Sequence, residues 1–317
     1  MRVKTEQEKG FAASRKRITA FIKRELRASG AGWMFISPLV IGIALFTMYP
    51  MVQSLLYSFY DYDGGRVFEF IGLANFRYMF GLDFSEVAKV FGNTFLYAAI
   101  SVPLNLCLSY LLAVLVNQKI KGVTVFRVLY YLPVVIPGVV SGVIWSQIMD
   151  PSSQGVFNLI LGHLGIPPGG FFATESTALM SAIVMNLWGL GGGMVLWLAA
   201  LKNIPNGLYE AARIDGAGVL RRFFFITVPL STPMIFYNLV TGIIGAMQTN
   251  HTMVFASDGG RGPNESLYFI AVKIYNEAFT GKDFGYASAL AWMLFIIIAI
   301  LTAITFMTSK WVYTGDE

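Results

Sequence analysis

Long apolar runs without internal charge constrain this sequence more than any other feature. A transmembrane helix needs about 20 consecutive apolar residues to cross the hydrocarbon core of a bilayer. Only 13% of the residues are charged and 56% are hydrophobic, whereas about 25% of the residues in a soluble domain are charged. The sequence therefore predicts an all-α integral membrane protein with six spans, at about 31–59, 92–116, 125–148, 177–201, 223–249 and 284–308.

These runs divide the chain into five parts. We expect a basic cytoplasmic segment at 1–30, the first span at 31–60, an extracytoplasmic segment at 61–91, a core domain with five spans at 92–309, and a cytoplasmic tail at 310–317. Residues 1–30 carry nine Lys and Arg, with apolar residues at helical spacing between them. Two readings stay open for this segment: an interfacial helix on anionic headgroups, or a disordered basic tail.

The distribution of Lys and Arg predicts the orientation. The N-terminal segment, the turn at 117–127, the loop at 201–222 and the C-terminal tail together carry 17, and the three alternate connections carry 6. Positive residues favour the cytoplasmic side, so we expect both termini and the 201–222 loop in the cytoplasm of a bacterial inner-membrane protein. The net charge of +5 is thereby assigned to topology and not to nucleic-acid binding.

The sequence offers no pattern for catalysis, a metal or a nucleotide. It has no HExxH, no GxxxxGK[ST] loop, one cysteine (Cys107) inside an apolar run, and two histidines far apart, His163 and His251. Asp, Glu, Lys and Arg are missing from the interiors of the spans, which argues against ion-coupled transport and intramembrane acid–base chemistry. We therefore expect a non-enzymatic chain with no cofactor of its own. A stand-alone channel or carrier and a membrane enzyme are the alternatives; the enzyme would need a titratable cluster near one face, and the sequence suggests none.

The stretch from Glu210 to Pro233 is the one long polar connection with a recognisable pattern. Pro205 should end the preceding helix, because proline cannot donate the next backbone hydrogen bond. We expect Asn206 to cap a short helix at 207–214 and Gly216 to let the chain turn. Since the same loop joins the fourth and fifth spans, force on this helix would reach both.

The stretch resembles the EAA loop of bacterial binding-protein-dependent ABC importer permeases. That pattern is EAA, three residues, Gly, nine residues, Ile, one residue, Leu-Pro; only Val228 departs from it. ISPLVIGIALFTMYP, RVLYYLPVVIPGVVSGVIW and FGYASALAWMLF are similar to spans of the maltose, lactose and glycerol-3-phosphate permeases. The resemblance implies a six-span type I importer permease bundle with a cytoplasmic coupling helix that contacts an ATPase. The coupling-loop residues it implies are Glu210, Ala211, Ala212, Asp215, Gly216 and Pro229.

The same resemblance implies partners and a cargo. The partners are a second permease subunit, two ATP-binding subunits that hold ATP and Mg, and an extracytoplasmic solute-binding protein. The cargo would be a sugar or sugar-like solute, with glycerol-3-phosphate or a polyol as alternatives. No span offers a cationic contact, which favours a neutral saccharide.

A neutral polyhydroxylated solute needs hydrogen-bonding side chains and an aromatic face at mid-membrane. The candidates for the solute path are Asn186, Trp188, Gln248, Asn250 and His251. An interhelical hydrogen bond is the alternative for Asn186, and an interfacial anchor for Trp188. The glycine run at 189–193 predicts either close helix packing or a local break.

Overall fold

The computed structural model describes residues 32–118 and 121–313. Both readings of residues 1–30, and residues 314–317 of the predicted tail at 310–317, lie outside the described residues. The chain divides into two compact units, residues 1–56 and 57–317.

The first unit contains an apolar helix that is long enough to cross a membrane, Gly32–Tyr57. One turn of it is widened into a π-helix, η1 (Ala44–Met48), before α2 (Tyr49–Tyr57) continues, and the Tyr49 N–H donates to the Ala44 carbonyl five residues back. Pro50 follows directly. Its ring crowds the carbonyl four residues earlier and it has no N–H to donate, so the wider turn accommodates it.

The second unit opens with a hairpin. Strands β1 (Tyr60–Tyr62) and β2 (Phe68–Phe70) are antiparallel, with Tyr60 opposite Phe70, and α3 (Ala74–Phe80) follows. The Asp63 carboxylate accepts hydrogen bonds from three backbone amides and fixes the turn between the strands.

Two further helices are continuous and apolar enough to span a membrane, α4 (Phe84–Val116) and α17 (Phe284–Met307). Helix α4 begins before residue 92, where the sequence predicted the second span to start. Its first turns therefore carry Glu86 and Lys89.

Three more spans are pairs of helices joined at a bend. The pairs are α5 (Val123–Val135) with α6 (Gly138–Ile148) at 102°, α8 (Glu175–Leu187) with α9 (Leu190–Lys202) at 46°, and α11 (Val219–Arg222) through η3 (Phe223–Thr227) and α12 (Val228–Leu230) with α13 (Thr232–Met247) at 64°. Proline or glycine lies at each break. Pro137 precedes α6, Gly189 precedes α9, and Pro229 follows a π-helical turn as Pro50 does.

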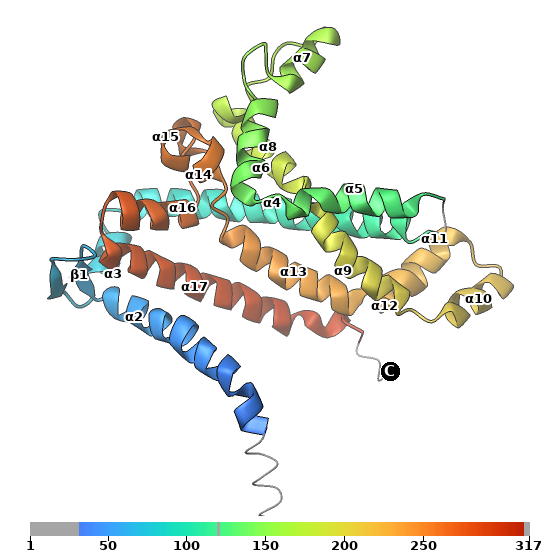
Figure 1. The fold of residues 1–317 in the computed structure, drawn as a ribbon, viewed down its shortest axis with the longest axis horizontal. Coiled ribbons are helices and arrows are strands. Elements are labelled where there is room, and N and C mark those ends of the chain that lie inside the picture. The colour runs from blue at the N-terminus through green and yellow to red at the C-terminus, as the bar shows by residue number, and fades with distance from the viewer. Residues whose placement is uncertain (1–31, 119–120, 314–317) are drawn as a thin grey trace, which may run out of the picture. The chain divides into compact units, whose positions relative to one another are not determined.

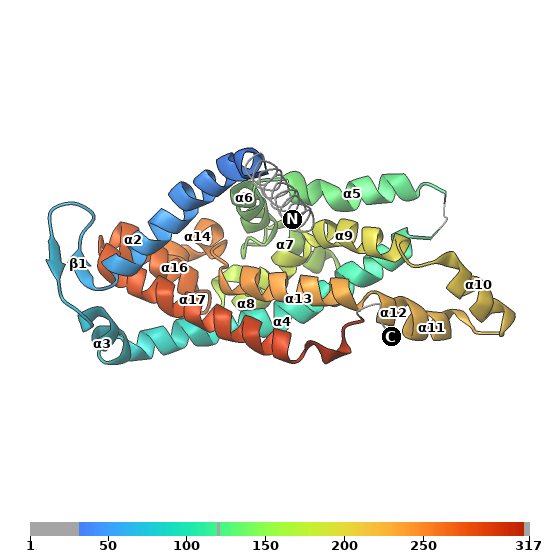
Figure 2. The same cartoon turned by 90° about the horizontal axis from the view of Figure 1, so that it is seen from below.

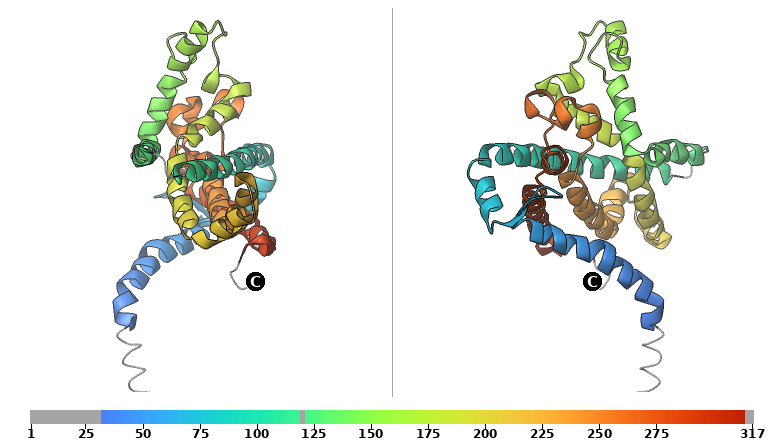
Figure 3. Two further views of the ribbon diagram at one scale, coloured as in Figure 1. Left: turned by 90° about the vertical axis from the view of Figure 1, so that its right-hand side faces the viewer. Right: turned by 60° about the vertical axis from the view of Figure 1, so that its left-hand side comes forward.

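Short elements fill the connections. They are α7 (Val156–His163), η2 (Phe171–Ala173), α10 (Asn206–Ile214), α14 (Thr252–Phe255), α15 (Ser257–Gly260), η4 (Pro263–Glu265), α16 (Ile270–Tyr275), η5 (Asn276–Thr280) and η6 (Ser309–Trp311). Figures 1 and 3 show α7 projecting away from the long helices of the second unit.

The core of the second unit lies along α4, which packs against α9 and α13, while α13 packs against α17 (Figure 1). Two buried clusters occupy this core. One includes Tyr97, Ile183, Phe269 and Leu290, and the other includes Tyr110, Met194, Trp197 and Leu201. Figure 2 shows α10 and α11 near one end of this unit and β1 and α3 near the other.

Candidate functional site

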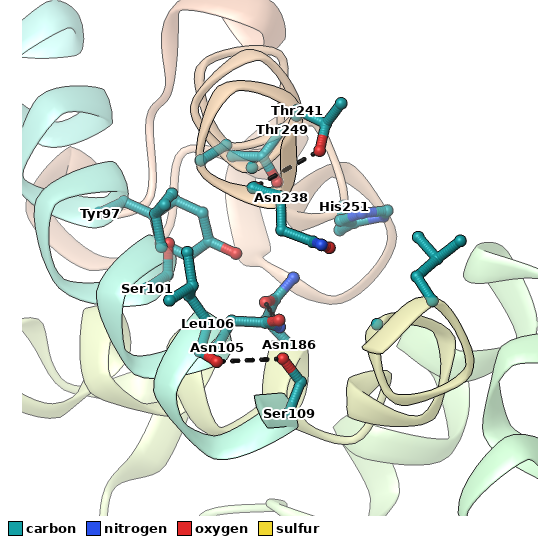
Figure 4. Close-up of a pocket in the computed structure, with 16 residues that line it drawn as sticks. Tyr97, Ser101, Asn105, Leu106, Ser109, Asn186, Asn238, Thr241, Thr249 and His251 are labelled. Atoms are coloured by element: carbon teal, nitrogen blue, oxygen red, sulfur yellow. Dashed lines mark hydrogen bonds between the residues drawn. The ribbon is translucent and has the colours of Figure 1, made fainter. Parts of the chain in front are cut away.

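A polar cavity of about 310 Å³ lies between α4, α8, α9 and α13 (Figure 4). On α4 its lining residues recur every fourth position, which places them on one face of the helix. On α13 a second stripe faces them. The polar lining residues are Tyr97, Ser101, Asn105, Ser109, Asn186, Asn238, Thr241, Thr249 and His251. In a membrane, such side chains turn toward the protein interior because lipid offers them no hydrogen bonds.

The side-chain amides that line this cavity use only some of their hydrogen-bonding groups within the protein. The Asn105 Nδ2 donates to the Asn186 Oδ1 at 3.3 Å, and the Asn238 Nδ2 donates to a backbone carbonyl of its own helix. Among the described residues, nothing accepts from the Asn186 Nδ2 or donates to the Asn238 Oδ1. Each of these amides therefore offers a free hydrogen-bonding group to a ligand.

His251 closes one side of the cavity, and its ring lies close to Gly138 at the start of α6. Neighbouring protein atoms displace water from the ring and lower its pKa, although the residue still opens onto the cavity. This favours the neutral form of the imidazole. No Asp, Glu, Lys or Arg is among the described lining residues, so the cavity is polar and uncharged.

The structure brings two of the five predicted path residues, Asn186 and His251, to this cavity. The other three lie outside its lining. Trp188 packs edge to face against Trp145 at 5.8 Å between centroids, and Gln248 and Asn250 are exposed at the end of α13.

The polar stripe on α4 and its partners on α13 were not predicted from the sequence. The signal was present, because Tyr97, Ser101, Asn105 and Ser109 repeat at four-residue spacing inside an apolar run. Four-residue spacing places side chains on one helix face, and polar residues on one face of a spanning helix indicate an interior path.

The glycine run at 189–193 provides both a local break and close helix packing. Gly189 lies at the break between α8 and α9. Gly191 allows α9 to contact α5, since a Cβ there would overlap the Tyr130 carbonyl oxygen. Gly193 lies beside Ser109 at the cavity wall.

Helix α10 occupies the predicted coupling loop. The prediction that the Asn206 side chain caps it is wrong, because Asn206 is the first helical residue and no side-chain cap forms. The C-terminus follows a Schellman motif: the Ala217 N–H donates to the Ala212 carbonyl and the Gly216 N–H to the Arg213 carbonyl. Gly216 has φ of +75°, which glycine adopts without strain and other residues rarely adopt.

The coupling-loop residues lie mostly on the surface. Glu210, Ala211, Asp215, Gly216 and Pro229 are exposed, and Ala212 is half-buried. Large apolar side chains beside them are exposed too, with Ile214 at 87% and Leu220 at 74%. An exposed apolar patch rimmed by charge is typical of a protein–protein contact.

Polar contacts lead from α10 toward the cavity. The hydroxyls of Tyr209 and Thr227 are 2.9 Å apart, and Ser231 donates to the Thr227 carbonyl at 2.6 Å. The Tyr110 hydroxyl then donates to the Ser231 hydroxyl at 3.2 Å. These contacts link α10 to the end of η3, to Ser231 between α12 and α13, and to α4.

An aromatic contact continues the link. The rings of Tyr110 and Trp197 lie edge to face at 4.9 Å, and the Trp197 Nε1 donates to Ser109, which lines the cavity, at 3.0 Å. A connected series of side chains thus runs from α10 to the cavity wall.

A buried charge cluster lies on the other side of the cavity, where the sequence suggested no titratable cluster. Lys273 of α16 is 1% exposed and lies 3.0 Å from Asp83, 3.0 Å from Glu86 and 3.1 Å from Glu277. Tyr286 donates a short hydrogen bond to Asp83. Burial opposes the charged form of Lys273, but the hydrogen bonds to Glu86 and Asp83 outweigh it and raise its pKa.

This cluster corrects the expectation that the chain has no such group. Two of its acids, Asp83 and Glu86, lie far from Lys273 in the sequence and meet it only in the fold, whereas Glu277 lies one helical turn after it. Every described cationic group near its centre is paired, so the cluster fastens the start of α4 to α16 and α17. We assign it a structural role.

Comparison with known proteins identifies the family. Residues 106–313 match the family described as binding-protein-dependent transport system inner membrane component. A probable ABC transporter permease, YesP of Bacillus subtilis, is 39% identical over 89% of this chain and 92% of its own length. A multiple sugar-binding transport system permease, MsmF of Streptococcus mutans, is 31% identical over 88% and 95%, respectively. An sn-glycerol-3-phosphate transport system permease, UgpA of Yersinia pestis, is 30% identical over 86% and 92%.

The fold has a solved counterpart. A crystal structure of a bacterial ABC transporter involved in the import of the acidic polysaccharide alginate superposes with a TM-score of 0.79 at 20% identity, covering 91% of this chain and 98% of that one. The chain therefore belongs to the family of inner-membrane components of binding-protein-dependent transport systems. The predicted all-α importer-permease fold is confirmed, and the chain is a multi-pass transport subunit.

Proposed function

We propose that this chain is one of two permease subunits of an ATP-driven importer that carries a neutral sugar or oligosaccharide. An extracytoplasmic binding protein would deliver the solute, and two separate ATP-binding subunits would hold ATP and Mg. Both termini and α10 would face the cytoplasm, as the Lys and Arg distribution favours. Relatives named for multiple sugars and lactose support a saccharide cargo.

The uncharged polar cavity is the observation that carries the choice of solute. Its lining offers amide, hydroxyl and imidazole groups, which suit the hydroxyls of a sugar, and Tyr97 adds an aromatic ring. An anionic solute would lose its hydration without gaining a counter-charge there. A neutral saccharide or polyol therefore fits this cavity better than glycerol-3-phosphate.

The position of the cavity supports the coupling. Helix α9 carries Gly193 at the cavity wall and leads into α10, and α13 carries the opposite wall and follows α10 through α11 and α12. An ATPase that moved α10 would act on both walls. Glu210 is the exposed charge on this helix that we expect to meet the ATPase.

The test is uptake by the complex that co-purifies with this chain, reconstituted in liposomes with its binding protein. We expect ATP-dependent uptake of a labelled neutral saccharide that unlabelled saccharides compete for and glycerol-3-phosphate does not. Glu210→Lys should abolish uptake while the amount of membrane-inserted chain stays the same. Uptake without ATP, or normal uptake by Glu210→Lys, would refute the assignment.

The cavity residues give a second arm to this test. Asn186→Leu removes the free amide from the cavity and should raise the solute concentration needed for half-maximal uptake. Asn250→Leu changes an exposed amide outside the lining and serves as the matched control. If both variants raise this concentration equally, the cavity does not recognise the solute.

A further inference from the structure

A second cavity, of about 680 Å³, lies beside α10 and is lined by cations. Lys202 ends α9, Arg213 lies on α10, and Arg222 ends α11, so three elements each contribute one positive charge. No Asp or Glu is among the described residues that line it. The cavity therefore has an unbalanced positive charge.

The helical register of α10 turns its polar face into this cavity. Asn206, Tyr209 and Arg213 are spaced i, i+3 and i+7, which places them on one helix face, and all three line the cavity. Glu210 does not line it. The acid of the coupling helix thus stays on the surface while its arginine borders the cavity.

The cations at this cavity lack an ion-pair partner within the described part of the chain. Among the described residues, no carboxylate forms an ion pair with Lys202, Arg213 or Arg222. The Arg222 Nε is buried and has no hydrogen-bond partner in the described chain. A buried donor of a charged group that makes no hydrogen bond is unfavourable, so a ligand that accepts from it would be stabilising.

We propose that this cavity binds a phosphate group, supplied either by the headgroup of an anionic phospholipid or by a free phosphorylated solute. Guanidinium groups match phosphate oxygens in a planar, two-pronged geometry, and basic pockets at the cytoplasmic ends of membrane helices hold anionic headgroups. The amides of Asn117 and Gln118 at the end of α4 provide further donors. The volume lies in the range of small-molecule sites and leaves room for the group esterified to the phosphate.

The placement of this site at the cytoplasmic leaflet rests on the proposed orientation. Bound phosphate would join the ends of α4, α9, α10 and α11, because residues from all four line the cavity. The ligand would thus hold α10 against the bundle and set how far an ATPase can move it.

The experiment uses the purified full chain in detergent. Native mass spectrometry measures retention of phosphatidylglycerol against phosphatidylcholine with the same acyl chains. Thermal unfolding is measured in inorganic phosphate against chloride at equal ionic strength. Retention of phosphatidylglycerol identifies a headgroup, and protection by phosphate without lipid preference identifies a free phosphorylated solute.

Substitutions locate the effect. Arg213→Gln and Arg222→Gln should each lower the preference for the phosphate-bearing ligand by about fivefold, the attraction of one Arg to an anionic headgroup. Arg221→Gln is the matched control, because Arg221 lies on the same helix, is exposed and does not line the cavity. Arg213→Lys should restore the preference in part.

The proposal has a clear refutation. If Arg213→Gln retains phosphatidylglycerol and is protected by phosphate to the same extent as the wild type and Arg221→Gln, the site does not bind phosphate. Arg213 is exposed, so its variant remains informative even where Arg222→Gln fails to fold. The measurement needs neither solute nor ATP, so its failure is distinguishable from failure of the uptake test.

Discussion

Replacing Lys273 by methionine should destabilise the chain more than neutralising any other charged residue that the structure describes. The Lys273 ammonium is 1% exposed and lies within 3.1 Å of three carboxylates. Asp83, the most buried of them, is 7% exposed. Methionine matches the length of the lysine stem and leaves the acids without their shared cation.

The magnitude follows from the burial of the acids. Removing one partner of a buried ion pair is unfavourable by about 3–5 kcal/mol, because the remaining charge stays out of water. Asp83 keeps the hydrogen bond from Tyr286, and Glu86 and Glu277 are partly solvated, so we expect the lower limit, about 3 kcal/mol. The pair of Lys89 and Glu265, at 39% and 31% exposure, should contribute less than about 1 kcal/mol.

Unfolding of the purified chain by SDS in mixed micelles, followed by tryptophan fluorescence, measures these differences. Lys89→Met is the matched control, since it removes a lysine from the same end of α4. Asp83→Asn in the Lys273→Met background should recover part of the loss, because the uncompensated buried charge is then gone. If Lys273→Met lowers the free energy of unfolding no more than Lys89→Met does, the buried charge cluster does not stabilise the packing of α4 against α16 and α17.

Three further predictions concern α10, the glycine run and the stability of the chain at low pH. Tyr209→Phe removes the hydroxyl contact with Thr227 and should lower the free energy of unfolding by about 1 kcal/mol and reduce solute moved per ATP hydrolysed in the reconstituted complex. Gly191→Ala should be destabilising by about 1–3 kcal/mol in the same SDS unfolding, since its Cβ meets a backbone carbonyl of α5, whereas Gly207→Ala, with open space around it, should not be. The hydrogen bond from Lys89 lowers the pKa of Glu265, so this ion pair stabilises the folded chain above the usual pKa of 4.5, and its contribution is lost as the pH falls through the lowered pKa. The free energies of unfolding of the wild type and of Lys89→Met should therefore converge at that acidic pH.

The spans and the coupling helix could be predicted from the sequence because their signals are local. Apolar runs fix where helices cross a membrane, and the prolines at 137 and 229 mark two of the bends that the structure shows. The EAA spacing marked α10, and Gly216 ends it in the left-handed conformation that the turn requires.

The cavity and the charge cluster could be predicted only in part because they depend on tertiary packing. Asn186 was recognised as polar in an apolar run, but its partner Asn105 lies on another span and needs the contact between α4 and α8. Lys273 and Asp83 were assigned to two separate polar connections, and only the fold brings them to 3.0 Å. The capping role expected of Asn206 failed because the helix starts one residue earlier than the sequence indicated.

The cavity at the middle of α4 and the cavity beside α10 differ in charge, and this difference affects what each can bind. The cavity at the middle of α4 has neutral polar walls, while the one beside α10 has three cations that form no ion pair with a described carboxylate. An anionic solute would be disfavoured by desolvation in the first and held by Coulomb attraction in the second. A neutral saccharide meets neither effect, since it needs only hydrogen bonds in the first cavity and has no attraction to the second. The same charge separation lets a phosphate group occupy the second cavity while a neutral solute passes the first, so the two proposals are compatible in one transport cycle.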